Sequence, residues 1–260
     1  MTRQVTEKSE RGEAVQGESA NGARTGGTVY ERYLRTDDLL QLQKTETERL
    51  HPDELTFQIV HQSIELWWKV TAQQIAAARA ALEAGGPGDA ARALRRVVTQ
   101  QELATQILRQ LEFVSPVDFL TIRAGLEDGS GMDSPGFRGI LRAAPELWET
   151  FMGALFRAGL TLETVYLDRR EHADWYELAE ALTDFDERFH IFRAAHLKLA
   201  ERHLGLRTVG TGGTPMELLE RTLHDLLFPD LWSMREGLVA QAQARQAAAG
   251  NEMARVTGGH

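Results

Sequence analysis

Hydrophobic residues recur at helical spacing along most of the chain. The clearest pattern starts at Pro52, has Asp53 and Glu54 in its first turn, and continues without a breaker to Gly85. Aromatic and polar side chains form one stripe along it, composed of Phe57, His61, Glu65 and Trp68. A second apolar pattern over 89–113 follows after a short glycine-rich loop. This spacing predicts two antiparallel neighbouring helices.

The rest of the chain, from residue 114 on, shows the same pattern, interrupted by turn residues. Glycine, serine, aspartate and proline crowd residues 127–139, which predicts a loop. Pro145 is interpreted as a boundary between this loop region and the next helix. Four further helices are expected, at 118–126, 146–166, 175–205 and 216–249. No stretch alternates with period two for long enough to predict a sheet, and no repeat is found, so we expect an all-α helical bundle.

The chain length sets the expected domain organisation. At 260 residues it can bury one substantial core, so a single helical domain is expected over 29–249. Residues 1–28 carry almost no large apolar side chain, and we interpret them as a disordered arm. A second disordered segment is expected at 250–260. Structure is expected to begin at Tyr30, with Tyr30 and Tyr33 on one side of a turn, and Asp37 or Asp38 is expected to cap a short helix that follows.

Composition excludes several classes of function. The formal net charge of −9 argues against binding a nucleic-acid backbone, which requires a basic face. Because the chain has no cysteine, any bound metal must be held by histidine or carboxylate. The N-terminus has no apolar signal core and no run reaches membrane-spanning length, so we expect a cytoplasmic protein that does not bind membranes.

A few polar residues stand out on the expected helices. His196 lies on a helix that is followed by the glycine-rich loop 210–213, which suits either a cofactor site with a lid or an ordinary core histidine. His61 and Glu65 are spaced as a helical metal pair, although such pairs are common by chance. Arg123 lies among apolar neighbours, which fits a ligand carboxylate or an internal ion pair equally well.

Five motifs occur along the chain in one order. They are Y-x-x-Y-L from Tyr30, F-x-x-x-H-Q-S-x-E-L-W from Phe57, D-F-x-x-x-R from Asp118 with S-G seven residues after the arginine, H-x-x-x-x-E-R-x-x-G from His196, and G-T-G-G from Gly210. This order resembles the tryptophan 2,3-dioxygenase family. Several matching stretches in sequence are far more specific than any one of them.

The resemblance extends from Tyr30 to about Arg235 and implies a complete set of properties. It implies an all-helical homotetramer that binds haem b through one histidine. It also implies an oxygenase that acts on the indole ring of L-tryptophan, a small-molecule substrate, with O2 as co-substrate.

The resemblance also implies a role for individual residues. His196 matches the axial ligand of the haem iron, and His61 matches the distal histidine beside the indole N–H. Phe57 matches a contact to the indole face. Arg123 matches the clamp on the substrate carboxylate, and Thr211 matches the loop hydroxyl at the amino acid end.

Other matched positions concern the neighbouring subunit and the substrate. Tyr30 and Tyr33 match residues that reach into the neighbouring subunit's site. Phe119 and Ser130 match substrate-binding positions, but Phe119 replaces the usual tyrosine. Met132 stands in S-G-M-D-S where the family has S-G-F-Q-S, and a softer side chain there can admit a substituted substrate. These departures favour a specialised, divergent member of the family.

Three alternatives to a tryptophan dioxygenase remain open from the sequence. One is a monooxygenase that forms a 2-oxindole from a β-methyltryptophan-type substrate, as divergent relatives in natural-product pathways do, and that needs an external reductant. Another is a haem-binding sensor or carrier without turnover. The third is a helical interaction protein without a cofactor.

Overall fold

The computed structural model describes residues 27–127, 129–206, 220, 221 and 223–257 of the chain. Within these ranges every regular element is a helix and no strand occurs, which confirms the all-α prediction. By backbone contacts the chain divides into two units, Met1–Leu42 and Gln43–His260. No described helix is both long enough and apolar enough to cross a membrane.

The first unit contains two short helices, α1 (Val29–Leu34) and α2 (Thr36–Leu39). α1 begins with a capping box, in which the Thr28 side chain accepts from the Glu31 backbone N–H and the Glu31 carboxylate accepts from the Thr28 N–H. Within their own unit the side chains of Tyr30 and Tyr33 are 70% and 85% exposed. These tyrosines therefore add nothing to a core of this unit.

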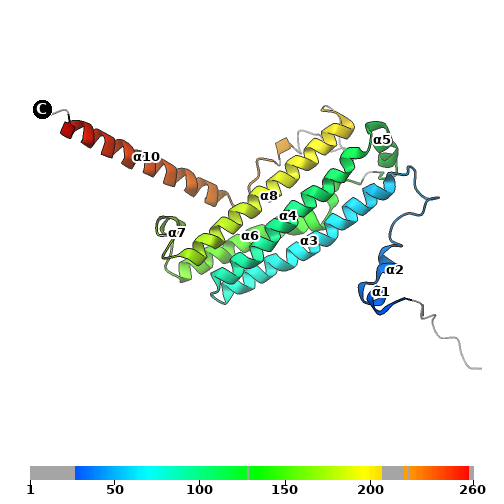
Figure 1. The fold of residues 1–260 in the computed structure, drawn as a ribbon, viewed down its shortest axis with the longest axis horizontal. Coiled ribbons are helices and arrows are strands. Elements are labelled where there is room, and N and C mark those ends of the chain that lie inside the picture. The colour runs from blue at the N-terminus through cyan, green and yellow to red at the C-terminus, as the bar shows by residue number, and fades with distance from the viewer. Residues whose placement is uncertain (1–26, 128, 207–219, 222, 258–260) are drawn as a thin grey trace, which may run out of the picture. The chain divides into compact units, whose positions relative to one another are not determined.

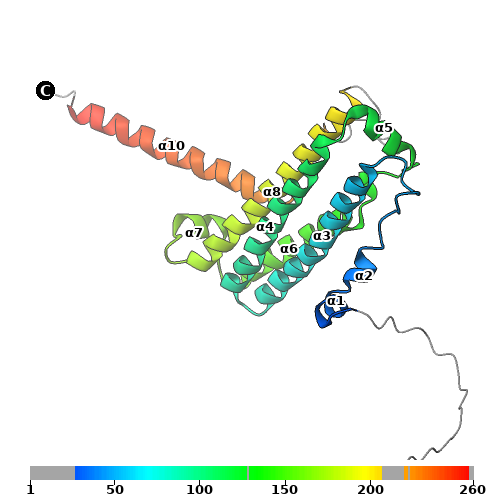
Figure 2. The same cartoon turned by 45° about the vertical axis from the view of Figure 1, so that its right-hand side comes forward.

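Four long helices build the second unit: α3 (Glu54–Glu83), α4 (Pro87–Leu108), α6 (Pro135–Arg157) and α8 (Ala173–Leu204). α4 packs against both α3 and α8, and α6 packs against the other side of α3 (Figures 1 and 2). The packing follows from the sequence period, because the buried residues of α3 are spaced three or four apart, as in Val60, Ile64, Trp68, Thr71, Ile75, Ala78 and Leu82.

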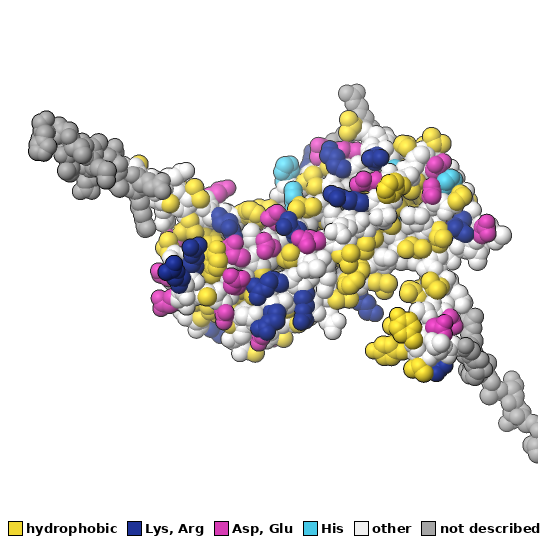
Figure 3. All heavy atoms as spheres, viewed as in Figure 1, with side chains coloured by type: hydrophobic (Ala, Val, Ile, Leu, Met, Phe, Trp, Pro, Cys, Tyr) yellow, Lys and Arg dark blue, Asp and Glu magenta, His cyan; other side chains and the backbone are white. Residues whose placement is uncertain are grey.

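Shorter elements close the ends of this bundle. They are η1 (Arg109–Phe113), α5 (Pro116–Ala124), η2 (Gly131–Asp133) and α7 (Leu162–Leu167), and the C-terminal helix is α10 (Pro229–Thr257). On the face shown in Figure 3, basic and acidic side chains are interspersed over the described part of the bundle. The acidic side chains on this face are thus mixed with basic ones and do not form one negatively charged surface.

The structure corrects the expected role of Pro145. α6 begins ten residues earlier, at Pro135, where Ser134 caps the first turn by accepting from the Phe137 N–H. Pro145 lies inside α6 on its exposed side, where water can satisfy the carbonyl that lacks a helical partner. The buried stripe of α6 continues on both sides of Pro145, with Ala144 before it and Leu147 after it, so packing outweighs the lost hydrogen bond.

Two other expected helices also differ from the observed ones. The block 146–166 is split, because Gly159 adopts a left-handed φ of 70° and Thr161 caps the separate helix α7. The last helix begins at Pro229 and not at Met216, and it runs to Thr257, past the expected end at 249. Residues 216–219 lie outside the described part of the chain, and Leu223–Phe228 is not helical.

A buried carboxylate on α8 holds the start of α10. Asp186 is fully buried and accepts hydrogen bonds from the backbone N–H of Leu227 and Phe228 and from Trp232 Nε1, at 2.9, 3.1 and 3.0 Å. Its charge also acts on the guanidinium of Arg193, which donates to the carbonyl of Asp225. These contacts fix the segment that precedes α10 against α8.

We expect Asp186→Ala to lower the free energy of unfolding by about 3 kcal/mol, because it leaves buried donors without their acceptor and removes the negative charge that acts on the buried Arg193 guanidinium. Urea unfolding followed by circular dichroism measures this loss. The matched control is Asp184→Asn, at an exposed aspartate two residues earlier on the same helix, with an expected change within about 0.5 kcal/mol. Equal effects of the two substitutions would refute the anchoring role of Asp186.

Candidate active site

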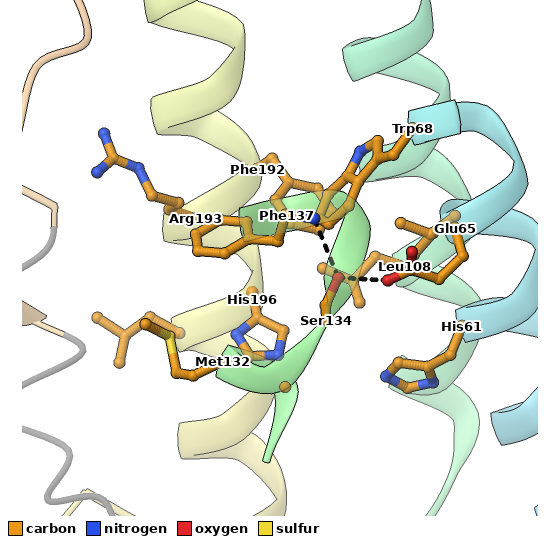
Figure 4. A pocket seen from close by; sticks show the side chains of 13 residues that line it. His61, Glu65, Trp68, Leu108, Met132, Ser134, Phe137, Phe192, Arg193 and His196 are labelled. Carbon is orange, nitrogen blue, oxygen red and sulfur yellow. Dashed lines mark hydrogen bonds between the residues drawn. The ribbon is translucent and has the colours of Figure 1, made fainter. Parts of the chain in front are cut away.

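Two histidines face one cavity from opposite sides of the bundle. His61 comes from the first half of α3, and His196 comes from the second half of α8 (Figure 4). Both rings line the same two adjoining pockets, together with Glu65, Met132 and Ser134. Residues 135 positions apart in the chain are thus brought to one cavity.

The cavity has a deep apolar part and a wider part toward α5. The deep part has a cavity volume of about 80 Å³, and its apolar walls are Ile64, Trp68, Leu108, Phe137, Phe192 and Leu197. The wider part has a cavity volume of about 390 Å³ and adds Phe57, Leu111, Phe119, Leu126, Ser130, His203 and Leu204. A mostly apolar lining with a few polar groups is typical of sites for small organic ligands and cofactors.

His61 is oriented by its own helix. Its Nδ1 donates to the carbonyl of Phe57 at 2.7 Å, since a carbonyl can only accept, and this leaves a lone pair on Nε2. The ring also contacts the Phe57 ring, with 4.2 Å between centroids. Burial lowers the pKa of His61, although the Phe57 carbonyl and the charge of Glu65 oppose this shift. His61 is therefore a neutral hydrogen-bond acceptor at pH 7.

His196 is the most strongly perturbed histidine in the site. Burial in the bundle, reinforced by His61 across the cavity, lowers its pKa to about 4, so the imidazole is neutral at pH 7. The ring is partly exposed and lines the cavity. A neutral imidazole is the form of histidine that binds metals.

A glycine allows the turn over His196 to approach its ring. A Cβ placed on Gly131 would lie 3.3 Å from His196 Nε2, which is tighter than ordinary van der Waals contact. The turn is held by its own capping box, in which the Ser130 N–H donates to the Asp133 carboxylate. Any larger side chain at Gly131 would press on the imidazole.

Glu65 fixes the other end of this turn. Its carboxylate accepts from the Ser134 hydroxyl and from the Gly136 N–H at 3.0 Å (Figure 4). It therefore caps the N-terminus of α6 from a different helix, where the helix dipole favours a negative charge. The spacing of His61 and Glu65 suggested a metal pair, but the structure uses Glu65 to position the turn. The sequence signal for this contact is the Ser-Pro-Gly start of α6.

Sequence comparison agrees with this geometry. The sequence model of the family described as tryptophan 2,3-dioxygenase matches residues 13–142 and 152–238, which is most of the chain.

The chain belongs to the tryptophan 2,3-dioxygenase family.

Individual relatives support this assignment. A protein of Caulobacter vibrioides named tryptophan 2,3-dioxygenase is 31% identical, and the match covers 81% of this chain and 98% of the relative. Proteins of the same name from Saccharopolyspora erythraea and Herpetosiphon aurantiacus are 29% and 28% identical, over 79% and 81% of this chain and 91% and 98% of theirs. The identity is low, but the match extends over nearly the whole length of each relative.

The structure brings most residues expected from this family together. Phe57, His61, Phe119, Ser130 and His196 all line the cavity. These residues come from α3, α5, the turn before α6, and α8, so the site depends on the packing of the whole bundle.

Other expected site residues lie elsewhere or outside the described part. Arg123 is half-buried on α5, one turn after Phe119, and does not line the two pockets. Tyr30 and Tyr33 belong to the unit Met1–Leu42. Thr211 and its glycine loop lie outside the described residues.

Sequence reasoning missed three residues of the site. Trp68 was placed on the helix stripe but not in the site, and its buried Nε1 has no hydrogen-bond partner among the described residues. Arg193 and His203 lie on α8, one turn before and two turns after His196, and also line the cavity. Their spacing from His196, at three and seven residues, was the available signal.

The low pKa of His196 predicts an acid-sensitive apoprotein. The unfolded ring binds a proton near pH 6.5 and the folded ring only near pH 4, so stability is unaffected above pH 6.5 and is lost progressively as the pH falls to 4. The expected loss from this group is about 3 kcal/mol. We expect His196→Gln to remove this part of the pH dependence in urea unfolding of the apoprotein, whereas His224→Gln, at an exposed histidine, does not. If the free energy of unfolding falls with pH in the same way for wild type and His196→Gln, the assigned burial is contradicted.

Proposed function

We propose that this protein is a haem-dependent oxygenase that inserts oxygen from O2 into the indole ring of L-tryptophan or a substituted tryptophan. The observation that carries the proposal is the pair of neutral imidazoles, His61 and His196, that face one apolar-walled cavity in a member of the tryptophan 2,3-dioxygenase family. One ring is available to hold a metal and the other to hold a substrate.

The residues of the deep pocket fit haem b. His196 offers a neutral nitrogen, and Trp68, Phe137 and Phe192 offer flat apolar walls against which a macrocycle can pack. The Trp68 Nε1 adds a buried donor without a partner among the described residues, which suits an acceptor on a bound group. A flat ring in contact with the backbone is separated from it by about 3.5–4 Å. The turn at Gly131 therefore has to move away from His196 to admit the macrocycle.

Bound haem supplies the iron at which O2 is activated. The chain's own residues position the substrate and exclude water. His61 Nε2 is placed to accept a hydrogen bond from an indole N–H, because Nδ1 already donates to Phe57. The Phe57 ring beside it offers a face for the indole. Glu65 stays bonded to the start of α6 and keeps the turn from Ser130 to Ser134 over the cavity.

We propose that Arg123 and Thr211 bind the amino acid end of the substrate. A guanidinium binds a carboxylate with two parallel hydrogen bonds, which suits Arg123 on the helix that also carries Phe119 into the pocket. The residues 207–219 include Thr211 and follow directly after α8, the helix that carries His196. Both roles rest on the family motif and not on a contact in this structure.

We further propose that the protein is a homotetramer in which Tyr30 and Tyr33 complete the site of a neighbouring subunit. Their high exposure within their own unit supports this role, since large aromatic side chains are otherwise covered. The side chains of Leu39, Leu40 and Leu42 in that unit are exposed as well.

Oxygen labelling tests the reaction directly. We expect the reduced, haem-reconstituted protein to convert L-tryptophan under 18O2 into an N-formylkynurenine-type product with two labelled atoms, measured by mass spectrometry. His61→Phe removes the acceptor for the indole N–H and is expected to lower kcat/KM about tenfold.

The other outcomes are equally informative. A product with one labelled atom would replace dioxygenation by 2-oxindole formation, which requires an external reductant because the second oxygen leaves as water. Met132 lines both pockets and is the residue to vary in that case, with β-methyltryptophan as the substrate. If neither product forms and neither substrate changes the haem spectrum, the proposed function is refuted.

A further inference from the structure

His203 is a buried polar residue of the cavity that the proposed reaction does not use. It lies on α8, its side chain is only 5% exposed, and it lines the wider part of the cavity. Its Nε2 lies 3.1 Å from the carbonyl oxygen of Leu111 and 3.2 Å from that of Val114. Since carbonyls only accept, Nε2 carries the proton and Nδ1 carries a lone pair.

The ring of His203 is held in place by an aromatic stack. It lies against Phe119, with 4.5 Å between centroids and 14° between planes, and Phe119 in turn contacts Phe57 at 6.3 Å. Burial lowers the pKa of His203, against the opposing effect of the Val114 and Leu111 carbonyls, so the ring is neutral at pH 7. His203 is thus a fixed, neutral ring in the lining of the wider part of the cavity, and its one lone pair is on Nδ1.

The surroundings of this acceptor favour a cation. Aromatic faces attract ammonium groups, and Phe57 and Phe119 line the same part of the cavity. Two carboxylates also line it. Asp133 is paired with Arg138, whereas Glu65 accepts from the neutral Ser134 hydroxyl and Gly136 N–H, so the charge of Glu65 repels an anion. A neutral imidazole lone pair cannot bind a carboxylate, whereas it readily accepts from an N–H.

We propose that His203 is a specificity-determining residue that accepts a hydrogen bond from the α-ammonium group of the substrate. It thereby selects amino acids over indole acids that lack the amine. This inference rests on the proposed function, because it places an indole amino acid in the same cavity. It assigns the recognition of the cationic group to α8, separately from the carboxylate.

Two substitutions separate the acceptor from the structural role of the ring. In His203→Gln the amide nitrogen replaces Nε2 and keeps donating to Leu111 and Val114, but the acceptor at Nδ1 is lost. In His203→Asn the carbonyl oxygen replaces Nδ1 and the donation is lost. The probes are L-tryptophan and indole-3-propionate, which has the same ring and carboxylate without the amine.

Isothermal titration of the haem-loaded protein without O2 measures both affinities. We expect the wild type to bind L-tryptophan about tenfold or more tightly than indole-3-propionate, the range of one hydrogen bond to a charged group. His203→Gln should lower the affinity for L-tryptophan about tenfold and change the affinity for indole-3-propionate by less than about twofold. His203→Asn should keep the preference for the amino acid.

Other outcomes overturn the inference. If His203→Gln weakens both ligands equally, the residue acts only through packing. If it leaves the affinity for L-tryptophan unchanged, no hydrogen bond to the ammonium exists. If the wild type binds neither ligand, the proposed function itself fails, and this result is distinct from a loss confined to the variant.

Discussion

The site depends on keeping two imidazoles neutral on opposite sides of one cavity. Burial achieves this for His196, whose pKa falls to about 4, and for His61, whose pKa is also lowered. Charged rings could neither bind a metal nor accept a hydrogen bond from a substrate. Because the two residues come from α3 and α8, which α4 separates, their placement depends on the packing of the long helices.

A second constraint is the turn between these histidines. Glu65 reaches from α3 to the start of α6, and Gly131 brings the turn against His196. One end of the turn is thus fixed by a charge and the other lies against the imidazole whose nitrogen is available for a metal. Under the proposed function, binding of the flat cofactor displaces the glycine end while the glutamate end stays bonded. The capping residues of α6 are therefore part of the site as well as of the fold.

The sequence predicted the features that follow from local patterns. Periodic apolar positions identified the long helices, and the motif order identified His61, His196 and Phe119. Prediction from the sequence failed where a contact between distant residues decides the bounds of a helix or the partners of a side chain. Pro145 was expected to precede a helix that begins at residue 146, because the sequence does not show that one buried stripe of α6 continues on both sides of it. The partners of His203 are carbonyls about 90 residues earlier, and no local pattern encodes them.

The central claim is that His196, and no other histidine, binds the haem iron. Resonance Raman spectroscopy of the ferrous haem-loaded protein tests it most directly, because an iron–histidine stretching band shifts when the histidines carry 15N. We predict that this band is present in the wild type and in His61→Ala, and that His196→Ala does not retain stoichiometric haem. An unchanged band and full haem content in His196→Ala, with their loss in His61→Ala, would contradict the account.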